Sequence, residues 1–525
     1  MTDNQAAVSG AANDKEAQIV TTAMASSADN DSASLHSAGG RSLRVPMTMK
    51  LLSVVLVSLI GFGSHWSSGV TGAMKSTLKK KLHINNAEYA LLDASEDFIK
   101  SALIVGTGLV TDRIGGAHAL LWGNSLYSVG AILVAAATTV RSYRFMIGGI
   151  VVQAIGDVTT QVAQYKVFSS WFAPSDGFAS TLGFELGLGK IGSFVGQATA
   201  NVIARRLGDF SWVYWMAVVM NVFTNIVTVG FFYFTRWCGR RYGDLADPAT
   251  GERLTENNKS FELKKVCALP WPFWAVMAFS LFETSTAIVF SGNATELAEQ
   301  RFHIDSVKAG WYAALSKYTG FFLVPVLGFV IDRFGQRLTI MLVCGAFMFT
   351  AMALVAWGET VSGTAASFGV YAVALSLGPT TIIDSTRTSM WYPEVFGSAY
   401  GIKIGLNNAM NIIIRIVTGV IQDQDNDSYD RVVIVYAVLA AASLVVGISL
   451  VILGRFSIDL GRLQWSRIKR MAKGHTIGER RELFETGKNA RRHRLFSQSC
   501  LVAAISLIVG SWIAYFWGVA TGNND

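Results

Sequence analysis

The chain of 525 residues is too apolar for an ordinary soluble protein. Hydrophobic residues make up 51% of it and charged residues only 15%, against roughly 25% charged in soluble domains. The apolar residues come in blocks of about twenty, the length that crosses a hydrocarbon core of roughly 30 Å. Secreted, fibrous and nucleic-acid-binding classes are therefore poor fits. The four cysteines include no CxxC pair, so neither a disulfide framework nor a zinc site is indicated.

The net charge of +8 is concentrated in one stretch near the C-terminus. Between Arg455 and Arg494 there are twelve Lys/Arg and four Asp/Glu, which account for the whole excess. We interpret 456–497 as a basic cytosolic segment beside the membrane. Anionic lipid is its expected partner, and nucleic acid is not.

The pattern of apolar blocks predicts an all-α integral membrane protein. Residues 1–46 are rich in Ser, Ala, Asn and Asp, which predicts a disordered cytosolic N-terminus. A polar segment, 236–270, separates two six-helix halves, 47–235 and 271–455, and a further apolar stretch, 498–519, predicts an additional C-terminal transmembrane helix. The twelve main spans are predicted at 48–73, 89–111, 117–138, 143–170, 177–203, 209–235, 271–294, 307–330, 337–357, 362–390, 397–421 and 431–454.

Two motifs recur with the same offset in the two halves. Trp171-Phe172 recurs as Trp391-Tyr392, 220 residues further along. A GxxxDRxG motif recurs with the same offset, as Gly108, Asp112, Arg113 and Gly115 in the first half and Gly328, Asp332, Arg333 and Gly335 in the second. The halves are therefore expected to be structural copies, as in secondary transporters whose binding site lies between the repeats at the midplane.

The duplicated motif resembles the signature of the major facilitator superfamily, over roughly residues 47–455. The run 183–193 is similar to the fifth helix of the domain-containing protein 1 group of that superfamily, the lysosomal dipeptide uniporters. Further similarity lies in Gln164-Tyr165 and in 396–401. The resemblance implies that a basic residue at Lys190 binds substrate, although the group more usually has Arg there. It also implies a monomeric transport unit with an accessory membrane glycoprotein.

The same resemblance implies a gate at the cytosolic helix ends. The Asp and Arg of the two motifs would pair across the halves and lock the outward-open state, while the motif glycines allow close backbone approach. The basic loops place this side in the cytosol. Four lysines between the first two spans, at 75, 79, 80 and 81, fall on the other side, and we interpret them as a solvated helical extension. Asn426-Asp427-Ser428 predicts glycosylation of Asn426 in a lumenal loop.

Ionisable residues inside spans are the candidates for a site, because a charge at the bilayer centre is costly without a partner or a wet cavity. A face of the second span carries Asp93, Glu96, Asp97 and Lys100. Two interpretations stay open for all such residues, structural ion pairs between helices or substrate ligands. The candidate substrate ligands are Asp157, Lys190, Glu283, Lys317, Glu185, Asp384, Arg387, Lys403 and Asn407.

A cavity with charges of both signs suits a zwitterion, whose ammonium and carboxylate need opposite partners. We therefore expect a secondary transporter, not an enzyme, that moves dipeptides or amino acids by alternating access across a vacuolar or lysosomal membrane. Two alternatives remain, a proton-coupled exporter of organic compounds at the plasma membrane and a non-transporting nutrient receptor. The sequence contains no GxxxxGK[ST] loop and no HExxH pattern, so we expect no nucleotide or metal cofactor.

Overall fold

The computed structural model describes residues 45–242, 245–250, 253–254, 263–358 and 360–521. The predicted disordered segment 1–46 thus lies almost wholly outside the described residues. The chain divides into two units, and the larger, Val45–Cys238 with Asp244–Asp525, contains all the features discussed below. Of the smaller unit, the described part is the end of one helix and the residues next to it.

Local signals explain where several helices of the first half begin and end. Gly61 separates the first span into two pieces, a capping box at Asn85 begins the next long helix, and Gly115, with φ of 87°, ends it. The helices are α2 (Met47–Ile60), α3 (Phe62–Ala73), α4 (Lys75–Leu82), α5 (Asn86–Ile114), α6 (Gly116–Val140), α7 (Tyr143–Trp171), α8 (Phe178–Leu207) and α9 (Ser211–Arg241).

The second half repeats this arrangement after a short connection. The connection contains an antiparallel pair of two-residue strands, β1 (Leu245–Ala246) and β2 (Arg253–Leu254), and α10 (Leu263–Val266). The half itself comprises α11 (Trp271–Phe302), α12 (Ser306–Phe334), α13 (Arg337–Trp357), α14 (Val361–Ser389), η1 (Pro393–Val395), α15 (Phe396–Gln424) and α16 (Val432–Phe456). It is followed by α17 (Ile458–Gly461), η2 (Arg462–Gln464), α18 (Arg467–Ala472), α19 (Gly474–Thr486) and α20 (Ala490–Thr521).

The predicted all-α membrane fold is confirmed. Each of the twelve predicted spans coincides with a long helix or, for the first, with α2 and α3 together. In the described part of the chain, eleven segments are long and apolar enough to cross a membrane, α20 among them. The long helices α5 and α8 fall short of that measure. Both lie at the seam between the halves, where polar residues face protein instead of lipid.

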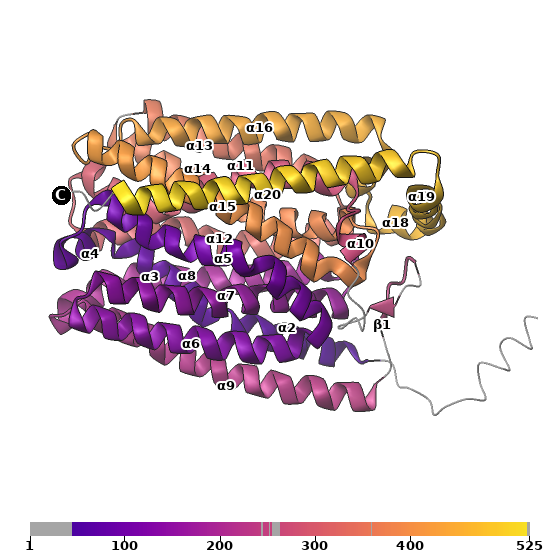
Figure 1. Cartoon of the computed structure of the whole chain (residues 1–525), viewed down its shortest axis with the longest axis horizontal. Coiled ribbons are helices and arrows are strands. Elements are labelled where there is room, and N and C mark those ends of the chain that lie inside the picture. The colour runs from indigo at the N-terminus through magenta and orange to yellow at the C-terminus, as the bar shows by residue number, and fades with distance from the viewer. Residues whose placement is uncertain (1–44, 243–244, 251–252, 255–262, 359, 522–525) are drawn as a thin grey trace, which may run out of the picture. The chain divides into compact units, whose positions relative to one another are not determined.

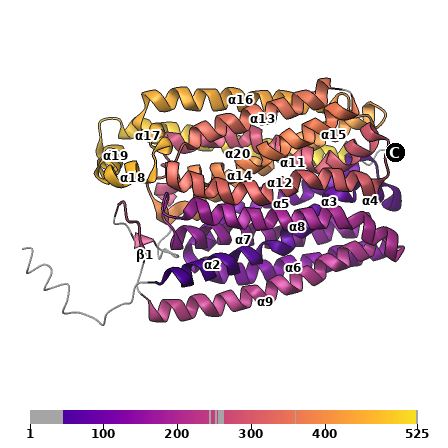
Figure 2. The ribbon, with the colours of Figure 1, turned by 180° about the vertical axis from the view of Figure 1, so that it is seen from behind.

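The helices of the larger unit lie side by side with roughly parallel axes, and the seam runs between the two halves (Figures 1 and 2). Along the seam α5 packs on α15, and α8 packs on α12. Gly108 and Gly328 make these contacts possible. A Cβ at Gly328 would lie only 2.4 Å from the carbonyl oxygen of Ala179, and one at Gly108 would lie 3.0 Å from that of Gly397.

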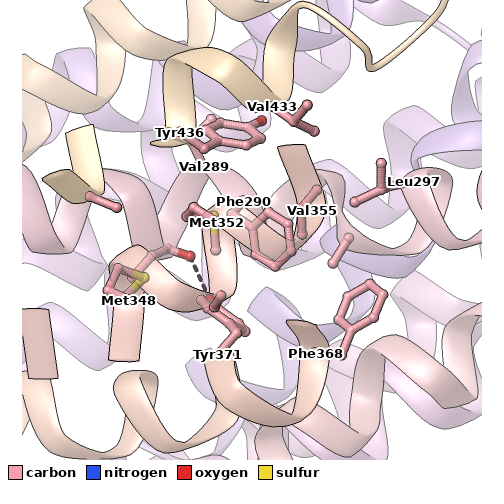
Figure 3. Packing of buried hydrophobic residues seen from close by; sticks show 14 of the residues in the cluster. Val289, Phe290, Leu297, Met348, Met352, Val355, Phe368, Tyr371, Val433 and Tyr436 are labelled. Atoms are coloured by element: carbon pink, nitrogen blue, oxygen red, sulfur yellow. Dashed lines mark hydrogen bonds between the residues drawn. The ribbon is translucent and has the colours of Figure 1, made fainter. Parts of the chain in front are cut away.

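Each half has an apolar core of its own. In the first half Trp66, Leu92 and Tyr214 belong to one cluster of buried side chains. In the second half Phe290 packs between the rings of Tyr371 and Tyr436, as Figure 3 shows. The Tyr371 hydroxyl donates a hydrogen bond of 2.7 Å to the carbonyl of Ala287. Separate cores are what rigid halves moving about a seam require.

The additional helix α20 lies against both halves at the seam, along α5 and α15 (Figure 1). Its Trp512 donates a hydrogen bond of 2.9 Å to Ser101 of α5, and Tyr515 stacks on Phe98 with ring centroids 4.7 Å apart. At its start, Ser497 accepts a hydrogen bond of 3.2 Å from Trp274 of α11. Its opposite face is exposed and apolar, as expected for contact with lipid.

We predict that Trp512→Ala lowers the stability of the purified protein. The change removes a half-buried ring and a hydrogen bond, and should cost roughly 1–3 kcal/mol, a fraction of the loss at a fully buried tryptophan. Trp517→Ala is the matched control, since that ring is 54% exposed. Thermal unfolding in detergent should show a lower midpoint for the first variant alone. Equal midpoints for the two variants would contradict the docking of α20 through this face.

Candidate functional site

The first group of charges inside the spans forms ion pairs. Lys100 of α5 contacts Asp157 of α7 at 2.5 Å and Glu96 at 2.5 Å. Arg415 of α15 contacts both Asp93 and Asp97 of α5, at 2.5 and 2.9 Å. Every charged residue on that face of the second predicted span thus has an ionic partner. Asp157, a predicted substrate ligand, is therefore engaged within the first half.

A second group of charges, carried by α8 of the first half and by helices of the second half, has no such pairing in the described part of the chain. Glu283 of α11 is 1% exposed, and its carboxylate accepts from the hydroxyl of Thr284 at 3.1 Å and faces the Cys344 thiol at 3.7 Å. Lys190 of α8 has no hydrogen bond or ion pair among the described residues. The charges that act on its ammonium are those of Lys317, Glu283 and Glu185.

Two more lysines complete this group. Lys403 of α15 lies over the ring of Tyr400, 5.6 Å from its centroid, and interacts electrostatically with Glu283. Lys317 of α12 donates a hydrogen bond of 2.5 Å to the hydroxyl of Ser291. Neither lysine forms an ion pair within 4 Å in the part of the chain that the structure describes. We call Lys190, Lys317, Lys403 and Glu283 the unpaired cluster.

Glu185 of α8 connects this cluster to α3 and α7 of the first half. Its carboxylate accepts from the Gln164 amide and from the Tyr165 hydroxyl, both at 3.3 Å, and lies 3.4 Å from Nε2 of His65. Tyr165 in turn packs edge-on against Tyr400 of the second half, with ring centroids 4.8 Å apart. A continuous polar and aromatic path thus crosses the seam.

Tyr165, Tyr400 and His65 were missed as site candidates by the sequence analysis. The two tyrosines lie in the very segments that carry the family resemblance, 164–165 and 396–401, which was the available signal. Of the predicted polar ligands, Asn407 exchanges hydrogen bonds of 3.0 and 3.2 Å with Ser280 of α11. It lies one turn from Lys403 on the same helix, and so adjoins the cluster.

The duplicated motif lies at one end of the seam, which we call the motif end. Asp112 of α5 accepts hydrogen bonds from the backbone N–H and the hydroxyl of Ser398, at 3.0 and 2.8 Å. Asp332 of α12 accepts from the backbone N–H and the hydroxyl of Ser180, at 2.7 and 2.6 Å. Ser398 and Ser180 are each the third residue of a helix. Each motif carboxylate therefore caps a helix of the other half.

The two aspartates supply N-terminal caps that the residues before α8 and α15 do not provide. Gly177 and Val395, which precede α8 and α15, offer no side-chain hydrogen bond. A capping oxygen contributes about 0.5–2 kcal/mol, and a carboxylate at a helix N-terminus also gains from the helix dipole. Lys166 adds an ion pair of 2.9 Å to Asp112 and donates to the carbonyl of Glu394, again across the seam.

The side chains of Arg113 and Arg333, the basic members of the motif, are exposed. The cross-seam hydrogen bonds described above are accepted by the carboxylates, and pairing of the two arginines across the halves stays a prediction. Asp384, predicted as a substrate ligand, forms a buried ion pair with Arg337. The Arg337 guanidinium also donates a hydrogen bond of 3.1 Å to the hydroxyl of Ser175 in the first half. Arg387, one turn further on, lies over the Phe396 ring. Asp384 and Arg387 thus both lie at the motif end, because they are in the last two turns of α14.

The opposite end of the seam is closed by a buried charge that sequence reasoning placed in solvent. Lys75 of α4 is 3% exposed and pairs with Glu296 of α11 at 2.7 Å. The Tyr429 hydroxyl donates a hydrogen bond of 2.6 Å to the same carboxylate. The Lys79 ammonium lies 3.2 Å from that carboxylate. The expectation of a solvated extension is therefore wrong for Lys75, although Lys80 and Lys81 are exposed as expected.

Cross-seam contacts thus exist at both ends of the larger unit. At the opposite end the Asn86 amide also donates a hydrogen bond of 2.9 Å to the carboxylate of Asp423. The Asn201 amide donates one of 3.0 Å to the carbonyl of Ser306. The unpaired cluster lies between the two closed ends. Asn426 is exposed in the turn after α15, at the opposite end, and its glycosylation stays a prediction.

Comparison with known proteins agrees with this architecture. The family model described as Major Facilitator Superfamily matches residues 57–414. The chain belongs to the major facilitator superfamily. Among solved structures of the superfamily, the transporter FucP, whose crystal structure is described as being in the outward conformation, has the same fold. It aligns with a TM-score of 0.55 at 14% identity, over 76% of this chain and 99% of its own.

Curated relatives within the superfamily are also similar. The chain is 21% identical to "Lysosomal dipeptide transporter MFSD1" of Homo sapiens over 393 residues, which cover 71% of this chain and 80% of that protein. It is 21% identical to the protein of the same name from Gallus gallus over 437 residues, covering 80% and 89%. As a superfamily member the chain is a multi-pass membrane transporter and not an enzyme.

We predict that Asp112→Asn and Asp332→Asn each lower the maximal transport rate and leave the apparent KM unchanged. Both carboxylates act at helix ends, away from the unpaired cluster. A cross-seam contact worth one or two kcal/mol shifts an equilibrium between two states about five- to thirtyfold. Lys308→Gln, at an exposed lysine at the other end of α12, is the control. Uptake kinetics in proteoliposomes that showed a raised KM with an unchanged maximal rate would overturn the gate assignment.

We predict that Glu296→Gln strongly destabilises the protein, since it leaves the Lys75 ammonium buried beside a neutral amide. Removing one partner of a buried ion pair costs about 3–5 kcal/mol. Asp430→Asn breaks the rim pair with Arg301, in which Asp430 is 74% exposed, and should cost under about 1 kcal/mol. Thermal unfolding compares the two; similar losses would show that Lys75 is not sequestered from water.

Proposed function

We propose that this superfamily member is a secondary carrier that moves dipeptides or similar small zwitterions across a lysosomal or vacuolar membrane by alternating access. The observation that carries the proposal is the unpaired cluster. Buried charges in membrane proteins are normally paired, as Lys75, Lys100 and Arg415 are in this protein. Lys190, Lys403 and Glu283 have no such partners in the described chain, which is the arrangement that a charged ligand would complete.

The chemistry of the cluster matches the two ends of a peptide. A terminal carboxylate accepts hydrogen bonds from ammonium groups, and Lys190, Lys317 and Lys403 supply three of them from α8, α12 and α15. A terminal ammonium requires an acceptor with negative charge, which Glu283 supplies from α11, with Glu185 nearby. Charge-assisted hydrogen bonds of this kind contribute about 1.5–3 kcal/mol each. A lipophilic solute would leave all of these groups uncompensated.

The dipeptide assignment draws on the relatives, which are lysosomal dipeptide transporters. Their identity of about one fifth supports the same substrate class. The family resemblance implies that Lys190 stands where the group usually has Arg, and an ammonium makes a point contact where a guanidinium makes a bidentate one. We therefore expect weaker discrimination for the carboxylate geometry. Asp157 and Asp384 are left out of the proposed site, because each has an ionic partner of its own.

The transport cycle that we propose uses the two closed ends in turn. With both ends closed, the cluster is sealed from both sides, as in an occluded intermediate. Release of the Asp112 and Asp332 caps would open the motif end, and release of Lys75 and Glu296 would open the other. The two halves then move as rigid bodies about the seam. A monomeric transport unit suffices for this cycle, and an accessory glycoprotein stays part of the proposal through the family resemblance alone.

Uptake by the purified protein tests the proposal. Proteoliposomes should accumulate a labelled dipeptide, and unlabelled dipeptide should compete. Lys190→Gln should raise the apparent KM about tenfold or more, since it removes a charge-assisted contact of about 1.5–3 kcal/mol. Lys308→Gln, at an exposed lysine at the start of α12, should behave as wild type.

Other outcomes would identify another function. Normal dipeptide uptake by Lys190→Gln contradicts the proposed site. Transport of lipophilic organic compounds that requires a proton gradient, with no dipeptide uptake, would favour the exporter. Dipeptide binding without turnover would favour a receptor.

A further inference from the structure

A cavity of about 330 Å³ lies at the motif end, apart from the unpaired cluster. The body of the transporter contributes Pro174, Asp247 and Trp391 to its wall, and the C-terminal segment contributes Arg462, Arg470 and His475. The volume is at the lower end of the range of small-molecule sites. None of its lining residues belongs to the unpaired cluster. Arg387, which the sequence predicts as a substrate ligand, lines this cavity instead.

The lining of the cavity is strongly basic. Arg387, Arg462, Arg470 and Arg481 all line it, whereas Asp247 is the one carboxylate that lines it in the described part of the chain. That carboxylate is already engaged, since Asp247 accepts a hydrogen bond of 2.9 Å from Arg470. Positive charge therefore exceeds negative charge around the cavity.

One of these arginines is buried, and a second, whose side chain is 12% exposed, is nearly so. Arg462 is 6% exposed; its guanidinium stacks on Trp391, 3.6 Å from the ring centroid, and donates to the carbonyls of Asp459 and Ser389. Burial, together with the nearby charge of Arg470, lowers the pKa of Arg462 to about 9. The buried Nε of Arg470 has no hydrogen-bond partner among the described residues.

We propose that this cavity binds an anion bearing several phosphate charges, supplied either as a lipid headgroup or as a soluble phosphate compound. Arginine is the side chain that suits this chemistry, because its planar fork donates two parallel hydrogen bonds to phosphate oxygens. Arg387, Arg470 and Arg481 come from three separate helices, and together they would share the charge of one ligand.

The place of the cavity favours access from the membrane surface. The C-terminal segment that closes it runs from Ser457 to Asn489, between two helices that are long and apolar enough to span the bilayer, α16 and α20. Arg467 of this segment contacts Asp176 of the first half at 2.5 Å. An anion held by Arg387 of α14 and Arg470 of α18 would therefore fasten the segment to the transporter body.

Thermal unfolding of the full-length protein in nanodiscs tests the site without measuring transport. One arm adds inorganic phosphate or inositol hexakisphosphate to nanodiscs of phosphatidylcholine, with chloride at matched ionic strength as the reference. The other arm places a phosphatidylinositol phosphate in the nanodisc. We expect the midpoint to rise in at least one arm, because a ligand that binds only the folded state stabilises it; the arm that responds identifies the source of the phosphate.

Charge-matched variants separate the cavity from general basicity. Arg470→Gln/Arg481→Gln should weaken the stabilisation about tenfold or more in ligand concentration. Lys488→Gln/Arg491→Gln removes the same charge from exposed positions of the chain and should leave it unchanged. Should the first double variant fail to fold, Arg481→Gln alone, with a side chain 33% exposed, replaces it. No midpoint shift in either arm, or equal weakening by both pairs of substitutions, would overturn the proposal.

Discussion

A charge inside a membrane protein needs a compensating partner, and this requirement organises the seam between the two halves. Lys100 and Arg415 satisfy it with carboxylates of neighbouring helices, and Lys75 satisfies it with Glu296 at one end. The motif carboxylates satisfy it with the N–H groups of helix ends. Because these charges are compensated within the protein, the remaining unpaired cluster stands out as the place where a ligand can supply the missing charge.

The same requirement gives the closed ends their reversibility. A helix N-terminus that is capped by an aspartate of the other half can be capped by water when the halves separate, so the cost of opening is the modest difference between the two. The opposite end depends on a buried ammonium and carboxylate, which become hydrated on opening. Both ends therefore use contacts that exchange with water, while the apolar cores around Phe290 and Trp66 keep each half rigid.

Helix positions were predictable because hydrophobic spans and the duplicated motif are local or periodic signals. The ion-pair partners of the charged residues could not be predicted in the same way. A pairing such as Arg337 with Asp384, or Lys75 with Glu296, depends on which helices become neighbours. Lys75 was placed in solvent because hydropathy and loop charge weigh a residue by its chain neighbours alone. Asp157 and Lys190 looked alike in sequence, each one charge in the middle of a span, and only the packing of α5 against α7 separates them.

The most direct test of the unpaired cluster is a coupling energy between protein and ligand. Equilibrium binding is measured for a dipeptide and for its C-terminal amide, each with wild-type protein and with Lys190→Gln. If Lys190 binds the carboxylate, amidation weakens binding to the wild type by about tenfold or more, and the two ligands bind Lys190→Gln almost equally. If amidation costs the same in both proteins, Lys190 does not contact the carboxylate and the account of the site is wrong.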